Sequence, residues 1–317
     1  MGAHVDQLLP VVRVGEIPRE ESAQRWLVDQ LWGASSVGVI GGAPKCSKTW
    51  LGLDLALSVA TGTPCLGEYA VPEPGPVLVY LAEDALPLVR ERVAGMARHR
   101  GLNLQSVEIH VITAPTLRLD LDPHRTRLFE TAKRLRPRLL LLDPLVRLHG
   151  IDENNAGEVA ELLAYIRSLQ RRLDLSVVLV HHTRKNAAGG AAAGQGLRGS
   201  SDIHAFGDSN LYLRRTKEHL VLSSEHRAAP AAPPVSLQLV ATDAETIHLE
   251  VVAELHDQQR RGLQDQVLDL LVAGVVLTRA KLRDSLGVKN ERLGEALESL
   301  EQTGRLRRTP TGWQRPD

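Results

Sequence analysis

The stretch GAPKCSKT, at residues 42–49, has the residue types of a phosphate-binding loop. It departs from the consensus G-x-x-x-x-G-K-[ST] at one position, where Ser47 replaces the second glycine. In such a loop backbone N–H groups hold phosphate oxygens, Lys48 reaches the terminal phosphates and the Thr49 hydroxyl binds Mg²⁺. The predicted nucleotide-binding residues are Gly42, Ala43, Pro44, Lys45, Cys46, Ser47, Lys48, Thr49 and Trp50.

The serine at position 47 bears on how well this loop works. If the position needs a positive φ, a residue other than glycine costs on the order of 1 kcal/mol. A cost of that size is small enough for the fold to absorb. The alternative interpretation of the motif is a glycine-rich turn between a strand and a helix, with no ligand.

Two acidic motifs follow apolar runs. LLLLDP ends in Asp143, and YLAED contains Glu83 and Asp84. A carboxylate at the carboxyl end of a buried strand lies where ligands bind in α/β folds. We therefore predict that Asp143 holds Mg²⁺ together with Thr49, and that Glu83 orients or deprotonates an attacking water. The alternatives are a turn aspartate before a proline and an acidic pair that caps the next helix.

A histidine pair ends another apolar run, VVLVHHTRK. We expect His182 at the same edge of the sheet, where a polar side chain could sense the γ-phosphate. The alternative is that His181 or His182 is a hydrogen-bonded histidine at the end of its strand.

These motifs need a sheet that brings their ends together, and residues 37–181 have the pattern of one. Short apolar runs at 37–40, 77–82, 107–112, 139–143 and 176–181 alternate with amphipathic stretches at 48–60, 86–100, 124–135 and 156–173. Such alternation predicts a mostly parallel sheet with helices on both faces. The continuous apolar runs LLLL and VVLV are typical of strands buried on both faces.

The pattern changes after residue 183. Residues 184–201 are rich in glycine and alanine and indicate a loop. The alternating runs SNLYLRR, HLVLSSE, VSLQLV and TIHLEVV then predict antiparallel strands that extend the sheet. From about residue 258 three amphipathic helices and a closing β-wing predict a small winged-helix domain. The predicted division is a lead-in segment at 1–36, an α/β core at 37–256 and a winged-helix-like domain at 257–317.

The bulk composition limits the classes of function. Formal net charge is zero, with 38 basic and 38 acidic residues, which excludes a strongly basic nucleic-acid coat but allows a local basic patch. The N-terminal sequence lacks the pattern of a signal peptide, and no apolar run approaches the roughly 18 residues of a membrane span. We predict a cytoplasmic protein that does not enter a membrane.

The ordered set GAPKxxKTW, YLAED, LLLDP, VHHTRK and LRGSS resembles the hexameric RecA-fold ATPases of the plasmid RepA helicase type, over about residues 20–255. The resemblance implies a RecA-like core and a ring in which ATP lies between subunits. It also implies a catalytic Glu83, a Walker-B Asp143 and a His182 that contacts the γ-phosphate. A neighbouring subunit supplies an arginine finger in such rings, and the matching stretch, HLVLSSEHRAAP, nominates Arg227. The alternative for Arg227 is a surface arginine at a strand end.

The resemblance also implies a DNA contact. Loop 184–200 occupies the place where such rings face single-stranded DNA in the central channel, and its cations are Arg184, Lys185 and Arg198. In the C-terminal segment Arg305, Arg307 and Arg308 form a basic wing that could follow a DNA backbone. The preceding helix, about 290–302, is acidic, so a protein-docking role for this domain stays open.

Two departures from the family pattern matter, namely Ser47 and the C-terminal domain. The resemblance therefore supports an ATPase of the RecA-like ring class better than a processive helicase. The sequence predicts an ATP- and Mg²⁺-dependent ring motor that acts on DNA, helicase-like or replication-associated. The alternatives are an ATP-switched regulator that binds duplex DNA without unwinding it, and a nucleotide-binding scaffold for other proteins.

Overall fold

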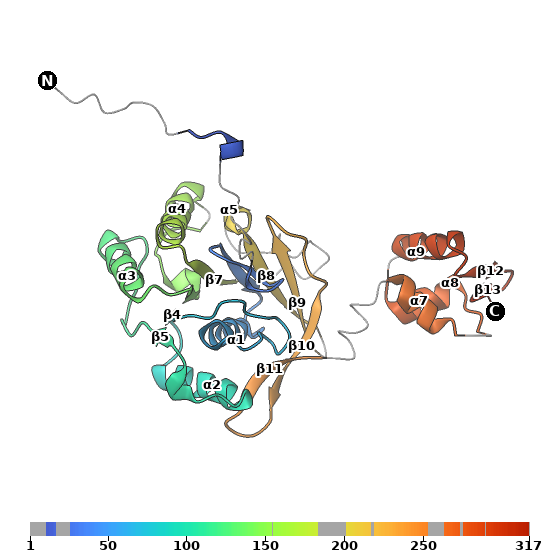
Figure 1. Ribbon diagram of the computed structural model, residues 1–317, viewed down its shortest axis with the longest axis horizontal. Coiled ribbons are helices and arrows are strands. Elements are labelled where there is room, and N and C mark those ends of the chain that lie inside the picture. Colours follow the sequence, from blue (N-terminus) through green and yellow to red (C-terminus); the bar gives the residue numbers. More distant parts are fainter. Residues whose placement is uncertain are drawn as a thin grey trace.

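A computed structural model of the chain describes residues 11–16, 26–153, 155–182, 201–216, 219–252, 263–272, 275–288 and 290–316. Its centre is a nine-stranded sheet with the order β11-β10-β9-β8-β3-β7-β6-β4-β5 (Figure 1). The strands from β5 to β8 in this order run parallel, and β9, β10 and β11 continue the sheet antiparallel. The predicted α/β fold, a mostly parallel sheet with an antiparallel extension, is confirmed.

The observed elements follow the predicted ones closely. The strands are β3 (Val37–Gly42), β4 (Val77–Leu81), β5 (Ile109–Val111), β6 (Leu139–Asp143), β7 (Ser176–His182), β8 (Ser209–Arg215), β9 (Leu220–His226), β10 (Val235–Ala241) and β11 (Ile247–Val251). The helices of this part are α1 (Lys48–Thr61), α2 (Leu86–His99), α3 (Asp122–Leu135), α4 (Ala156–Leu173) and α5 (Ser201–Phe206), with short 3-10 turns at Val14–Glu16, Leu104–Ser106 and Leu145–Arg147.

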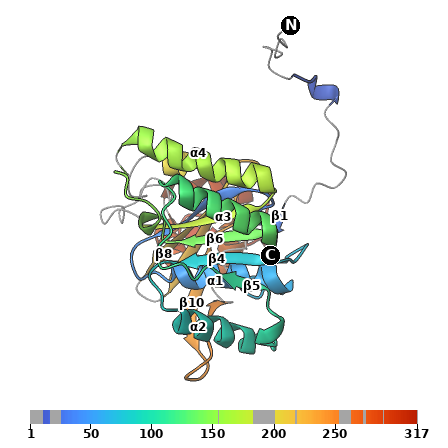
Figure 2. The ribbon, with the colours of Figure 1, turned by 90° about the vertical axis from the view of Figure 1, so that its left-hand side faces the viewer.

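Helices cover both faces of the sheet, with α1 and α2 on one side and α3 and α4 on the other (Figure 2). The alternation of side chains along a strand explains the two cores. On β6, Leu139 and Leu141 pack with α1 and α2, whereas Leu140 and Leu142 pack with α3 and α4. All four leucines are fully buried, so an apolar run without polar interruption is what this strand requires.

A short hairpin precedes the parallel sheet. Strands β1 (Trp26–Val28) and β2 (Trp32–Gly33) pair antiparallel, and their buried side chains Leu27, Val28, Leu31 and Trp32 belong to the same core as α1. The boundary between a lead-in segment and the core at residue 36 stays a prediction.

The described residues of the last part of the chain, 263–272, 275–288 and 290–316, contain three helices and a hairpin. They are α7 (Leu263–Leu270), α8 (Arg279–Leu286), α9 (Asn290–Gln302), β12 (Arg307–Thr309) and β13 (Gly312–Gln314). Their apolar side chains form a cluster of their own. Helix α8 begins after Thr278, whose side chain accepts a hydrogen bond from Lys281 N. It ends before Gly287, whose φ of 63° lies in the left-handed region. The winged-helix interpretation and the boundary at residue 257 stay predictions.

No helix within the described residues is long and apolar enough to cross a membrane. The cytoplasmic location stays a prediction.

A buried ion pair ties α1 to the end of α2. Asp54 Oδ2 lies 2.7 Å from Arg100 Nη2, and the two side chains are 3% and 12% exposed. The other Asp54 carboxylate oxygen accepts from Leu66 N at 2.8 Å. Arg100 also donates to two hydroxyl oxygens, those of Ser58 and Thr63, each at 2.8 Å.

Replacing Arg100 by alanine is expected to lower the free energy of unfolding by on the order of 3 kcal/mol, because it leaves a buried carboxylate without its cation. Arg98 is the matched control, since its ion pair with Glu245 is half-exposed and its replacement by alanine should cost less than about 1 kcal/mol. Urea unfolding of the two variants measures the difference. Equal losses would contradict this account of the pair.

Candidate nucleotide-binding site

Parallel strands bring the predicted site residues to one edge of the sheet. The β3–β7 register places Gly42 opposite His182, and the β4–β6 register places Leu81 opposite Asp143. All four residues end their strands, and Glu83 follows two residues after Leu81. The candidate phosphate loop, Asp143 and His182 therefore converge, as the sequence analysis predicts from their places at the ends of strands.

The loop connects β3 to α1, and its first residue, Gly42, is closely surrounded by other atoms. A Cβ atom on Gly42 would lie 2.5 Å from Leu213 O and 2.6 Å from Cys46 Sγ, so no larger residue fits there. Further along, Ser47 has a φ of 66° in the left-handed region. The left-handed conformation at position 47 explains why the consensus has glycine there. A serine in this conformation costs on the order of 1 kcal/mol of stability, as expected from the sequence.

Lys48 begins helix α1 and is buried at the centre of the loop. Its Nζ donates to Gly42 O at 3.0 Å and to Ala43 O at 2.8 Å, and lies 3.2 Å from His182 Nδ1. Burial lowers the pKa of Lys48 from its usual value, while Cys46 and Asp143 partly oppose that shift. The ammonium group is therefore held in a poorly solvated place where an anionic ligand would gain most from it.

Thr49 and Asp143 form the second contact of the site. Thr49 Oγ1 donates to Asp143 Oδ2 at 2.7 Å. Burial raises the pKa of Asp143 to about 6, and the Thr49 hydrogen bond partly opposes the rise. A hydroxyl and a carboxylate oxygen are ligands that Mg²⁺ accepts when phosphate oxygens and waters complete its shell, and a bound cation would favour the ionised carboxylate.

Glu83 lies beside this pair and contacts a residue that the sequence analysis did not nominate. Glu83 Oε1 accepts from Arg147 Nε at 2.7 Å, with both side chains at least half-exposed. Such an exposed pair is weak, so Glu83 can exchange partners at small cost. Asp84 is held differently, by Arg92 at 2.6 Å, and the Arg92 guanidinium lies over the Trp50 ring. Of the two carboxylates, Glu83 is the one left with more freedom to approach a ligand.

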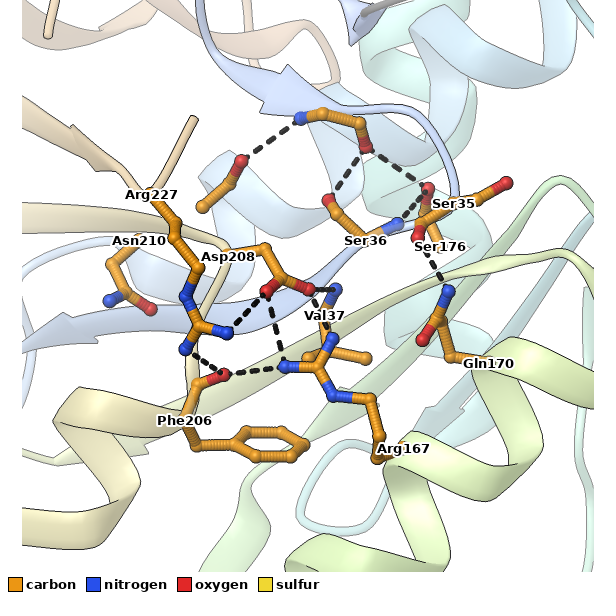
Figure 3. A network of polar contacts seen from close by, with 12 residues as sticks. Ser35, Ser36, Val37, Arg167, Gln170, Ser176, Phe206, Asp208, Asn210 and Arg227 are labelled. Carbon is orange, nitrogen blue, oxygen red and sulfur yellow. Dashed lines mark hydrogen bonds and ion pairs between the residues drawn. The ribbon is translucent and has the colours of Figure 1, made fainter. Parts of the chain in front are cut away.

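Arg227 lies at the other edge of the sheet. Strand β9 runs antiparallel to β8, so it begins near the phosphate loop and ends opposite Ser209. Arg227 follows it and pairs with Asp208, at 3.3 Å between Nη1 and Oδ1 (Figure 3). Arg167 of α4 binds the same carboxylate, which also accepts from Val37 N at 3.2 Å. Arg227 therefore lies away from the candidate phosphate loop of its own chain.

The predicted DNA-binding residues are only partly described. Arg184, Lys185 and Arg198 lie outside the described residues. Arg305, Arg307 and Arg308 are exposed on the C-terminal unit. Arg305 lies 3.5 Å from Asp265, and Arg308 lies over the Trp313 ring, so two of these three cations have partners within the unit.

A family model described as an AAA domain matches residues 5–188, which is more than half of the chain. The chain belongs to this AAA domain family. Membership implies nucleotide binding and agrees with the site residues that converge at the carboxyl edge of the sheet. The predicted RepA helicase type is finer than this match and stays a prediction.

The fold of this AAA domain protein is similar to that of a solved recombinase. The crystal structure of the RadB recombinase matches with a TM-score of 0.50 at 16% identity, covering 68% of this chain and 90% of that chain. At this identity the similarity concerns the fold alone. It confirms the predicted RecA-like core with its mostly parallel sheet.

Proposed function

We propose that this protein binds and hydrolyses ATP at residues 42–49 and works as a ring of identical subunits on DNA. The observation that carries the proposal is the convergence of the Lys48 ammonium, the Thr49–Asp143 pair and Glu83 at one edge of a parallel sheet. These are the groups that phosphoryl transfer to water requires, namely a cation for the phosphates, ligands for Mg²⁺ and a carboxylate for the nucleophile.

Each residue has a separate role in this proposal. Lys48 and the loop N–H groups hold the phosphate oxygens and stabilise the negative charge of the transition state. Thr49 and Asp143 would hold a Mg²⁺ ion, which would further stabilise the negative charge of the phosphates. Glu83 leaves its pair with Arg147 and orients the attacking water as a general base. His182 Nδ1 lies 3.2 Å from Lys48 Nζ, so His182 shifts when the terminal phosphate is lost, and this shift moves the end of strand β7.

The position of Arg227 supports the proposal of a ring. A cation near the γ-phosphate speeds hydrolysis, yet this arginine sits at the sheet edge opposite the phosphate loop of its own chain. If neighbouring subunits contact head to tail, the Arg227 edge of one subunit faces the loop of the next. Such an arrangement gives one composite ATP site per interface, and the hexamer predicted from the sequence is one ring of this kind.

DNA is the proposed substrate of the motor. Arg184 and Lys185 come within three residues of the end of β7, which carries His182, and Arg198 lies further along the same segment. A change at the terminal phosphate could therefore reach the segment that we propose faces single-stranded DNA. We propose that the C-terminal unit is a winged helix. Its exposed arginines would add contacts to the DNA backbone.

The test is steady-state ATP hydrolysis with no DNA, with single-stranded DNA and with duplex DNA, at two salt concentrations. We expect turnover that single-stranded DNA stimulates, with an effect that weakens as salt rises. Stimulation by duplex DNA alone would instead favour an ATP-switched regulator. Turnover that ignores both forms of DNA would contradict the DNA part and leave an ATPase whose partner is a protein.

A further inference from the structure

Strand β8 ends beside the phosphate loop. It runs parallel to β3, and the register that pairs Gly42 with Leu213 leaves Arg214 and Arg215 beyond the last paired residue of β3. Arg215 Nη2 donates a hydrogen bond to Lys45 O at 3.0 Å. Because side chains alternate along a strand, Arg214 projects to the opposite face. An arginine far away in sequence thus holds the backbone of the loop.

The loop contains two residues other than glycine in the left-handed region, Lys45 with a φ of 63° and Ser47 with a φ of 66°. Each costs on the order of 1 kcal/mol relative to glycine. The Ser47 side chain does not offset this cost by capping α1, since it makes no capping hydrogen bond. The carbonyl that Arg215 holds belongs to the first of these two strained residues.

We infer that Arg215 is a positioning residue of the phosphate loop, and that its hydrogen bond to Lys45 O stabilises the left-handed conformation that the serine at position 47 disfavours. The inference rests on the proposed nucleotide site. It assigns Arg215 a task in ordering the loop before ATP binds, and no direct part in the chemical step. A hydrogen bond from strand β8 thereby offsets the conformational cost of having serine instead of glycine at position 47.

The first test is ATP affinity, measured by titration of a fluorescent ATP analogue in the presence of Mg²⁺. Arg215→Gln should weaken binding about fivefold, because the binding-competent loop becomes a smaller fraction of the population. In hydrolysis assays KM should rise by a similar factor with kcat unchanged. Arg214→Gln removes the same charge one residue away and should stay within about twofold of wild type.

The decisive variant adds the consensus glycine. Ser47→Gly in the Arg215→Gln background should restore affinity to within about twofold of wild type, because glycine removes the cost that Arg215 offsets. Loss of affinity without rescue would overturn the inference, since Arg215 would then act on the nucleotide itself. An Arg215→Gln variant that binds like Arg214→Gln would overturn it as well.

Hydrogen exchange of the amides of residues 42–49, measured without nucleotide, separates this inference from the proposed function. Faster exchange in Arg215→Gln than in Arg214→Gln, restored by Ser47→Gly, supports the positioning role even if wild type binds no ATP. Failure of wild type to bind ATP would contradict the proposed function. Identical exchange rates of the loop amides in all variants would contradict the positioning role of Arg215.

Discussion

Replacing Lys48 by alanine is expected to lower the rate of ATP hydrolysis by a factor on the order of 10² to 10³. The ammonium group is buried, and it is held by Gly42 O, Ala43 O and the His182 ring. A cation in such a poorly solvated place interacts with phosphate far more strongly than one in water does. The residue is therefore expected to support both binding of ATP and stabilisation of the transition state.

Lys133→Ala is the control for Lys48→Ala. Lys133 is exposed near the end of α3, outside the loop, so its replacement should change the rate less than about threefold. Initial rates of phosphate release, together with binding of a fluorescent ATP analogue, provide the comparison. Similar losses in both variants would mean that the effect does not depend on the position of the lysine in the loop, and the assignment of Lys48 would be wrong.

Replacing Arg227 by alanine is expected to lower kcat by a factor on the order of 10³, with ATP binding nearly unchanged. The arginine lies at the sheet edge away from its own phosphate loop, so its effect must come through a neighbouring subunit. Arg171→Ala, on the exposed surface of α4, is the control for loss of a surface arginine and should leave kcat unchanged.

Mixing two inactive variants tests whether the site is shared between subunits. Lys48→Ala subunits retain Arg227, and Arg227→Ala subunits retain the loop. Random mixing in equal amounts makes about one quarter of the interfaces complete. We expect activity to return on mixing. If the mixture stays as inactive as its parts although mixed rings form, Arg227 does not act between subunits.

The sequence predicted the elements whose signal is local. The strands and helices of residues 37–182 agree with prediction to within about two residues, because continuous apolar runs and helical periodicity are read directly from neighbouring residues. The convergence of Gly42, Asp143 and His182 was also predictable, since the carboxyl ends of parallel strands share one edge.

The parts that the sequence did not reveal depend on register between distant strands. Arg215 reaches the loop because β8 pairs with β3 at Leu213, 171 residues after Gly42 in the numbering, and nothing near Arg215 indicates this. Arg147 pairs with Glu83 only because β4 and β6 are neighbours. The family resemblance nominated Arg227, but the antiparallel direction of β9 was needed to place it at the far edge.

The structure shows what the serine at position 47 does to the conformation of the loop. Its φ of 66° shows that the position does require a left-handed residue, so the departure from the consensus carries a cost. The surrounding contacts, from Lys48 to the carbonyls of the loop and from Arg215 to Lys45 O, hold the loop in place. We therefore expect a loop that binds ATP, although a glycine there would bind it at least as well.

Steady-state ATP hydrolysis with Mg²⁺, comparing wild type with Glu83→Gln, tests the central claim most directly. The account predicts turnover by wild type, and a Glu83→Gln variant that binds ATP as wild type does but turns it over at a rate lower by on the order of 10². Wild type that hydrolyses no more ATP than Lys48→Ala would contradict the claim that residues 42–49 form a working site. Unchanged turnover in Glu83→Gln would contradict the assignment of Glu83.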